Sequence, residues 1–431
     1  MRVILIFLVV LFPLLGESYK NLILSIDNSL AIKSAKYLQN SARELAIASK
    51  GDSLPSIDIK ADALYLQEQP TVTLHLPPPL GSLTAPMATS RKFEAELRVT
   101  YPIFSGFAIS SKIQKSFHQA EIAKLKVKDL KRNLILQLTM LFGKAKILQS
   151  TLKAQKEAIL SAKESLKKAQ KMYENGLLAP VEVANIKATL FSIEASISKT
   201  ESLYNQTVQS ISYLINRDIS NLKGSIAIRN LPSIKRVLKL AYSNRADIKI
   251  LKEQLSIDRA NIKLAKSKFY PKVGVVAGLK RQGDTLALDG DGFTNKNQSY
   301  LALNVDMNLY SGGKDLHTVE ALKYKKLSNY STFLDYKLKV KSEIKNGFEE
   351  LRALKVQKRT SIMQLKAQKK YYKQIKARFD NGLSSADELS RALANLAYAK
   401  AKYAQIQNLI KIQRAKIWLM IGVKSFKRAL R

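Results

Sequence analysis

Four short stretches of the chain alternate apolar and polar residues with a period of two, the pattern of a β-strand with one apolar and one polar face. They lie at about residues 56–66, 93–101, 272–281 and 300–310. In the second stretch, FEAELRVTY, the odd-numbered residues are apolar and most even-numbered ones are charged. Each stretch is about 9–11 residues long, which suffices for a tilted strand to cross a bilayer. We expect strands that face lipid on one side and water on the other.

The same alternation also fits a soluble β-sandwich, in which a second sheet covers the apolar face. Here the sequence indicates four strands and no second sheet. The segments that connect them, 67–92 with its five prolines and 282–299, are expected to be exposed loops. Four strands are too few to close a membrane barrel, which needs about eight, and open strand edges are not tolerated in lipid. We therefore expect several copies of the chain to share one barrel.

Long proline-free stretches follow the strand pairs, at about 106–175 and 313–381. As helices of about seventy residues, they would each be about 105 Å long. In the first, apolar or alanine residues recur every seven positions from Ile113 to Leu148, and a second such row runs from Leu138 to Tyr173. This spacing predicts coiled-coil packing between long helices. The expected fold is mainly α with a small β part.

Two motifs occur twice with the same offset. Gly176 and Gly382, each within Asn-Gly-Leu, lie 206 positions apart (382 − 176), and so do Gly106 and Gly312, each after a serine. A shared offset indicates two full-length copies of one unit. We assign 19–217 to the first repeat and 218–431 to the second. Residues 1–18, with Arg2 before an apolar run, resemble a cleaved export signal that ends near Ser18.

Each Asn-Gly-Leu motif is predicted to be a tight hairpin between two antiparallel helices, because glycine ends helices in the left-handed conformation. The hairpins are expected at 174–182 and 380–388. Pro180 suits a first helical position, and Ser385 has capping-box spacing to Glu388. The residues assigned to the two tips are Asn175, Gly176, Leu177, Pro180, Glu182, Asn381, Gly382, Leu383 and Ser385. The acidic residues are expected to cap helices or to act in gating.

The composition limits the functions that remain. The chain has no cysteine and three histidines in unrelated contexts, so we expect no enzyme activity, no metal site and no cofactor. The balance of 72 Lys+Arg against 34 Asp+Glu gives a net charge of +38. Such a charge is typical of nucleic-acid binding, but an export signal argues against that partner. The charge fits either solvated helix surfaces or a basic lumen or surface facing anionic partners.

The order and spacing of these features resemble the TolC-like outer-membrane efflux protein family over essentially the whole mature chain. The motifs that show the resemblance are LPSIDI and YPKVGVV where strands begin, YPIFSG and NLYSGG where strands end, and the two hairpins. The segment 231–251 resembles the start of the family's second repeat, with Ala246 where a proline is common. The resemblance implies a homotrimer with a shared 12-stranded β-barrel in outer-membrane lipid and a helical tunnel in the periplasm.

The resemblance also implies a passive duct that serves an inner-membrane transporter through a periplasmic adaptor (membrane fusion) protein. Its cargo would be small toxic compounds or proteins secreted by a type I system. Family members close the periplasmic end with acidic residues after the second tip glycine, which here correspond to Glu388 and, with reversed sign, Arg391; Asp387 is a neighbour. The gate is expected to be a ring of Glu388 side chains or a Glu388–Arg391 latch between chains.

Two other interpretations remain open at this point. A periplasmic coiled-coil adaptor or scaffold protein would share the heptad hairpins, although it would not need barrel strands or two copies of the hairpin. A basic coiled-coil protein that binds nucleic acid would explain the charge but not the signal.

Overall fold

The computed structural model describes residues 16–290 and 296–430. The expected export signal therefore lies almost entirely outside the described residues. The chain divides into two compact units, each built from both halves of the sequence. Unit 1 contains residues 1–37, 124–250 and 334–431, and unit 2 contains 38–123 and 251–333.

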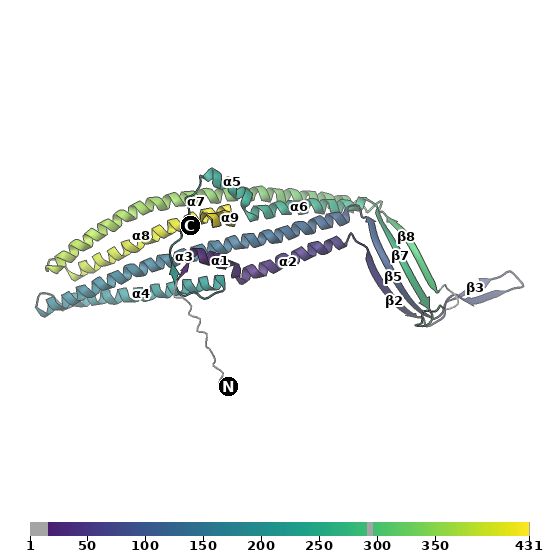
Figure 1. Cartoon of the computed structure of the whole chain (residues 1–431), viewed down its shortest axis with the longest axis horizontal. Coiled ribbons are helices and arrows are strands. Elements are labelled where there is room, and N and C mark those ends of the chain that lie inside the picture. Colours follow the sequence, from purple (N-terminus) through teal and green to yellow (C-terminus); the bar gives the residue numbers. More distant parts are fainter. Residues whose placement is uncertain (1–15, 291–295, 431) are drawn as a thin grey trace, which may run out of the picture. The chain divides into compact units, whose positions relative to one another are not determined.

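Unit 2 contains a four-stranded antiparallel sheet in the order β2-β5-β7-β8. Its strands are β2 (Ser56–Tyr65), β5 (Arg91–Phe104), β7 (Lys272–Gly283) and β8 (Asn297–Asp306), which overlap the four alternating patterns (Figure 1). The predicted end of the last strand, at residue 310, is wrong, because β8 ends at Asp306. Strands β5 and β7 come from different halves of the chain and pair in register over most of their length. Strands β2 and β8 form the two edges of this sheet.

The alternation places one continuous apolar face across all four strands. Leu97 of β5 lies opposite Ile59 of β2 and Leu279 of β7. Ile59 is 79% exposed, and Leu301 of β8 is 78% exposed. Burying such side chains would stabilise the sheet by about 25 cal/mol per Å², so this face is suited to lipid or to a partner surface.

The expectation of a loop over 67–92 is wrong in part. The segment contains a second hairpin, formed by β3 (Thr71–His75) and β4 (Ser82–Pro86). Its turn includes the three consecutive prolines and Gly81, which has φ of +64°. The prolines mark the turn, whereas TVTLH and SLTAP supply β-branched and apolar residues for pairing. The expectation of only four strands was therefore also wrong.

Four helices form the two long hairpins. They are α3 (Ala108–Glu174), α4 (Pro180–Ile215), α7 (Lys314–Asp380) and α8 (Ala386–Ile421), and α3 and α7 each have 67 residues (Figure 1). At 1.5 Å per residue, each of these two rods is about 100 Å long. Within the described part of the chain, no helix is both long and apolar enough to span a membrane. Two shorter helices, α2 (Leu30–Gly51) and α6 (Ala246–Lys266), complete the elements that extend into unit 2.

Unit 1 also contains several short elements, and its main core is shared between some of these and the long helices α3, α4 and α8. The short elements are α1 (Tyr19–Ser25), α5 (Ile234–Asn244), α9 (Val423–Ala429) and the strands β1 (Glu17–Ser18) and β6 (Leu222–Lys223), which pair in parallel; turns of 3₁₀ helix cover Ile26–Asn28 and, in unit 2, Ser267–Phe269. Phe142 of α3 and Phe426 of α9 are fully buried in this core. The Tyr19 hydroxyl bonds Thr139 at 2.6 Å. Burial raises the pKa of Tyr19 well above its ordinary value, so the phenol stays protonated.

The segment in which Ala246 replaces a proline contains a buried ion cluster in unit 1. Arg245 is 3% exposed at its side chain and donates to Asp247 through Nε at 3.1 Å and Nη2 at 2.7 Å. Asp247 also accepts from Arg132 at 3.2 Å and from the Tyr336 hydroxyl at 2.9 Å. Burial opposes ionisation of Asp247, but these donors outweigh it and hold its pKa below the usual value. Because Ala246 is the first residue of α6, a proline would also fit there.

The predicted heptad rows of α3 differ in part from its buried face. From residue 150 onward, the buried apolar positions of α3 are Ala154, Ala158, Ala162 and Ala169. Tyr173, which was predicted to lie in a packed row, is 49% exposed. Leu166, from the same row, is only partly buried where it packs against the apolar cluster near the ends of α3 and α7. Alanine lets neighbouring helices approach closely, so small residues occupy the innermost positions while larger ones flank them. A search for large apolar residues alone misses this face.

Candidate functional site

The first tip hairpin, 174–182, begins where α3 ends. Gly176 has φ of +73°, a left-handed conformation that only glycine adopts without strain. Its N–H donates to the Tyr173 carbonyl at 2.9 Å, and the N–H of Leu177 donates to the Met172 carbonyl at 2.8 Å. These two bonds form a Schellman motif, which satisfies the last carbonyls of α3.

The second tip hairpin, 380–388, repeats this geometry at the end of α7. Gly382 also has φ of +73°. Its N–H donates to the Phe379 carbonyl at 3.0 Å, and the N–H of Leu383 donates to the Arg378 carbonyl at 2.8 Å. The repeated Asn-Gly-Leu sequence therefore specifies the same helix ending twice.

The asparagine before each glycine takes part in the turn. The Asn175 N–H donates to the Lys171 carbonyl at 3.2 Å, and the Asn381 side chain donates to the Ala377 carbonyl at 2.8 Å. The leucine after each glycine points into solvent in this chain: Leu177 is 71% exposed and Leu383 is 67% exposed. Each tip thus presents an uncovered apolar side chain.

The two helices that leave the tips begin differently. Pro180 is the first residue of α4, and its N-cap, Ala179, has no side-chain hydrogen bond. Helix α8 has Ser385 as its N-cap, whose hydroxyl accepts from the Glu388 N–H at 3.2 Å. This is one half of the predicted capping box. The Glu388 carboxylate instead accepts from the Ser384 hydroxyl at 2.5 Å.

Glu182 caps a helix, but not its own. Its Oε2 accepts from the backbone N–H of Ala386 at 2.8 Å, at the first turn of α8. Ala386 is completely buried. The first tip therefore stabilises the N-terminus of the second-repeat helix and joins the two repeats at their tips. The sequence offered no signal for this bond, because it joins residues 204 positions apart.

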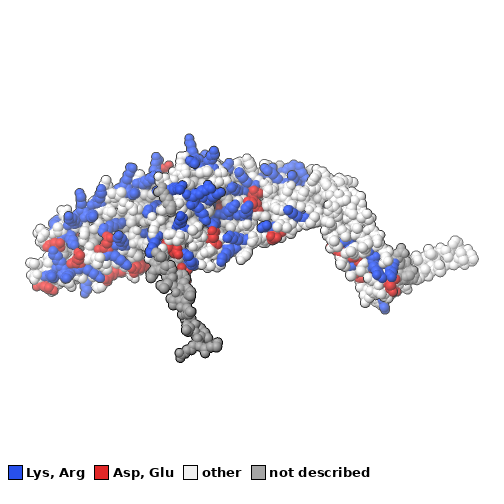
Figure 2. All heavy atoms as spheres, viewed as in Figure 1, with Lys and Arg blue, Asp and Glu red and all other residues white. Residues whose placement is uncertain are grey.

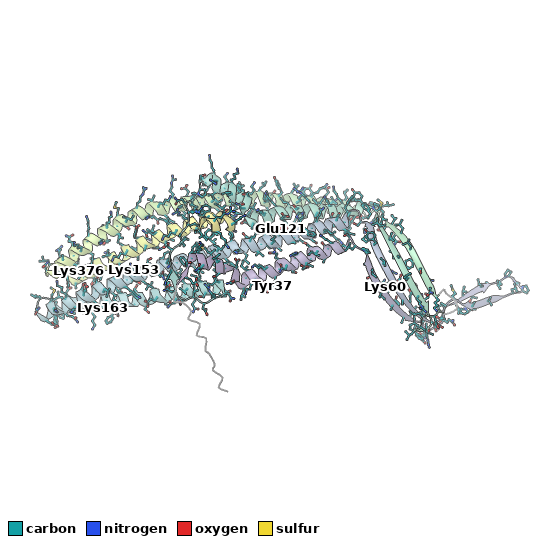
Figure 3. The ribbon with its side chains drawn as sticks, viewed as in Figure 1. Tyr37, Lys60, Glu121, Lys153, Lys163 and Lys376 are labelled. Atoms are coloured by element: carbon teal, nitrogen blue, oxygen red, sulfur yellow. The ribbon has the colours of Figure 1, made fainter. Side chains whose placement is uncertain are left out.

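A shared core and ion pairs hold the four helices together near the tips. Ile186 of α4, Ile375 and Phe379 of α7 and Leu389 of α8 are buried in one cluster. Lys168 of α3 pairs with Asp380 of α7 at 3.1 Å, and Lys376 pairs with Glu164 at 3.1 Å. Figure 3 shows Lys376 on α7 close to the tip. Further along, Lys400 of α8 pairs with Glu157 of α3 at 2.7 Å, and this hydrogen bond lowers the pKa of Glu157.

The three gate candidates lie on the first two turns of α8. Asp387 and Arg391 form an ion pair one helical turn apart, and both side chains are largely exposed. Glu388 is partly buried beside them. A contact from Arg391 to Glu388 of another copy would therefore have to compete with this internal pair.

The polar face of the sheet is electrically balanced. By register, its acidic residues are Asp58, Asp62, Glu94, Glu96 and Asp306, and its basic residues are Lys60, Lys92, Arg98, Lys272 and Lys280. Figure 3 marks Lys60 on β2. Tyr300 lies over Gly278, where a Cβ atom would meet the ring at 2.4 Å, and its hydroxyl bonds Glu96. The positive charge of the chain thus resides on its helices and not on this face.

The part of the chain that the structure describes contains no cluster of side chains suited to a metal ion. No group of three or more His, Cys, Asp or Glu that could hold a metal ion occurs in 16–290 or 296–430. His118 bonds Glu253 at 2.7 Å within unit 2, which is a structural contact between α3 and α6.

Solved structures share this fold. The outer membrane protein VceC from Vibrio cholerae has 15% identity and a TM-score of 0.78, covering 94% of this chain and 96% of that chain. The CmeC outer membrane channel from Campylobacter jejuni has 17% identity and a TM-score of 0.73, with 96% and 86% covered. The MtrE outer membrane channel from Neisseria gonorrhoeae, in its open state, has 16% identity and a TM-score of 0.70, with 94% and 89% covered.

Among proteins of curated function, none matches the chain by sequence. The family model described as "Outer membrane efflux protein" matches residues 22–217 and 237–423. The first match ends where the sequence places the end of the first repeat, and together the two segments cover most of the chain. The chain therefore belongs to the outer membrane efflux protein family.

Proposed function

We propose that three copies of the chain form an outer-membrane channel whose helices continue the pore as a duct through the periplasm. The observation that carries this proposal is the four-stranded sheet, which has an exposed apolar face and two unpaired edges, β2 and β8. Unpaired backbone groups in lipid cost several kcal/mol each. Pairing β2 of one copy with β8 of the next removes both edges at once.

Three copies supply twelve strands, which exceeds the roughly eight that a small membrane barrel needs. The trimer is favoured by the resemblance to TolC-like channels. The balanced polar face of the sheet suits a water-filled lumen that does not select cargo by charge at this level. The apolar face suits lipid.

The tips suit contact with other proteins. Each tip presents an exposed leucine on a hairpin that is held rigid by a Schellman motif. A periplasmic adaptor that binds there links the duct to an inner-membrane transporter, which supplies the energy. The cargo is small toxic compounds or secreted proteins.

The gate is formed by the first turns of α8. Three Glu388 side chains form a ring, or each pairs with Arg391 of a neighbouring copy. The second arrangement requires that Arg391 first leaves its ion pair with Asp387 of the same chain. Exposed pairs of this kind contribute about 0–1 kcal/mol each, so contact with a partner suffices to open them. Arg391→Ala and Glu388→Ala should each raise the conductance of the isolated channel. Unchanged conductance in both variants would refute the proposed latch.

The test of the proposed function is single-channel recording from the detergent-extracted protein in planar bilayers, with its mass measured in the same preparation. We expect discrete conductance steps from a particle of three chains. A water-soluble monomer that needs no detergent contradicts the proposal. Affinity co-purification after crosslinking then identifies the adaptor and the transporter class.

A further inference from the structure

Helix α7 carries two parallel seams along its tip half, within unit 1. The first is packed: Val340, Ile344, Leu351 and Leu354 are buried at steps of three, four and seven residues. The second, which we call the basic seam, starts at Lys341 and steps alternately four and three residues to Lys376. Nine of its eleven positions are Lys or Arg, and the other two are Phe348 and Ile362.

The basic seam is exposed and mostly unpaired. Only Phe348, Ile362 and Lys376 of its eleven residues are partly buried, and the rest are exposed. Among the described residues, only Arg352 and Lys376 of its basic side chains have an ion-pair partner. Residues 351–379 contain ten Lys or Arg and no Asp or Glu. Figure 2 shows the basic side chains gathering along the edge that α7 forms in Figure 1.

This pattern has the geometry of a helix-packing surface. Alternating steps of three and four residues keep side chains on one face of a helix, as in a coiled-coil seam. Over 35 residues the seam is about 53 Å long. Val356 and Met363, which are 59% and 68% exposed, follow the seam positions Lys355 and Ile362 directly and offer apolar contact beside the charges.

A second copy of the chain is poorly suited to cover the basic seam. In the tip halves of α3 and α4, the acidic residues away from the hairpin are Glu157, Glu164, Glu194 and Glu201, and each already pairs with a lysine of the same chain. Asp387 of α8 pairs with Arg391. No helix of unit 1, within the described residues, therefore has a row of free acids to match the seam.

We propose that the basic seam of α7 is a docking surface for a helix that carries acidic residues at the same alternating spacing. Rows of opposite charge along two helices determine partner choice and register. The partner follows from the proposed function: the acidic helix belongs to the helical hairpin of the periplasmic adaptor, which lies along α7 beyond its contact with the tips.

The test uses the full chain in detergent and a synthetic helical hairpin as the probe, with glutamates at alternating three- and four-residue steps on one face. Two control probes have equal charge: a hairpin with its glutamates spread around the helix, and unstructured polyglutamate. The variant R359E/K366E/K373E reverses three seam charges. Its matched control, K153E/K167E/K171E, reverses three exposed charges on α3.

We expect the matched hairpin to bind the unaltered protein, with an affinity that falls as salt rises. Loss of three exposed pairs should weaken binding about tenfold in the seam variant, and the α3 variant should bind as before. The proposal is overturned if the seam variant binds equally well, or if either control probe binds as tightly as the matched one. It is also overturned if the seam variant no longer assembles, because the seam then joins copies of the chain.

Conductance and particle mass are recorded on the same preparations. An unaltered protein that binds the matched hairpin but gives no conductance contradicts the proposed function and not the docking surface. A trimer that conducts but does not bind the matched hairpin contradicts the proposed docking surface and leaves the proposed channel function unaffected.

Discussion

Removing the carboxylate of Glu182 tests whether the first tip stabilises the start of α8. In the structure, Glu182 Oε2 accepts from the Ala386 N–H at 2.8 Å, while Ser385 satisfies the N–H of Glu388. The first four N–H groups of a helix have no partner within it. Glu182→Ala leaves the Ala386 N–H without its acceptor in a buried position.

The size of the effect follows from the kind of bond. A hydrogen bond to a charged group contributes about 1.5–3 kcal/mol, and a neutral one about 0.5–1.5 kcal/mol. Negative charge near a helix N-terminus adds about 0.3–1 kcal/mol. We expect Glu182→Ala to destabilise the first turn of α8 by about 2 kcal/mol. Glu182→Gln keeps a neutral acceptor, so it should cost about 1 kcal/mol.

Hydrogen exchange measures this change where it occurs. A loss of about 2 kcal/mol corresponds to amide exchange that is about thirtyfold faster, in peptides that contain 386–389. Exchange in the strands should not change. The matched control is Glu174→Ala, because this exposed acid also lies at the first tip and caps no helix in the structure. Equal exchange rates in Glu182→Ala and the unaltered protein, or an equal acceleration by Glu174→Ala, would refute the cap.

Three further predictions concern unit 1. Asp247→Asn removes the carboxylate that lies nearest the buried Arg245 and leaves it only the longer 3.4 Å contact with Glu343, so it should lower the free energy of unfolding by about 3 kcal/mol. Because the pKa of Asp247 is lowered in the folded state, its stabilisation is complete above about pH 4 and is lost as the pH falls through the lowered value. Acid denaturation of both proteins checks this. Gly143→Val should destabilise the packing of α3 on α8, because even a Cβ atom at this position would meet the Ile412 side chain at 2.2 Å and force it to move; thermal unfolding measures the loss. The export signal was predicted to cover residues 1–18, but Ser18 caps α1 by accepting from the Asn21 N–H at 3.2 Å. We therefore expect N-terminal sequencing to find cleavage before Ser18, and a mature chain that starts at Tyr19 contradicts this capping role.

Local sequence was sufficient for the parts of the fold that depend on neighbouring residues. Asn-Gly-Leu forms a Schellman ending after both α3 and α7, so both tips could be placed from the sequence. Period-two alternation likewise located the four strands of the sheet. The β3–β4 hairpin was missed because three consecutive prolines suggested a loop, although they occupy only its turn.

Contacts between the repeats could not be predicted in the same way. The bond from Glu182 to Ala386 depends on how helices from both repeats meet. The pairing of Arg391 with Asp387, in contrast, joins residues four positions apart on α8 and is a local feature of that helix. From its position two residues after Pro180, Glu182 was expected to cap a helix or to act in gating, and the sequence did not indicate a cap on the other repeat. The buried alanines of α3 were overlooked because close helix packing selects small residues, which give a weak hydrophobic signal.

The central claim is that the edges of the sheet are closed by other copies of the chain. Because the chain has no cysteine, a cysteine in place of Ile59 on edge strand β2 can be combined with one at Leu301, Leu303 or Val305 on edge strand β8. Single-cysteine variants serve as controls, since they can form dimers at most.

The most direct test of this claim is to oxidise the double variants in the outer membrane and to measure the size of the crosslinked species by denaturing gel electrophoresis. We predict that at least one pair produces crosslinked dimers and trimers and no larger species, because β2 of each copy lies beside β8 of the next in a closed ring of three. Monomers from every pair, or a ladder that extends beyond three chains, would contradict the account.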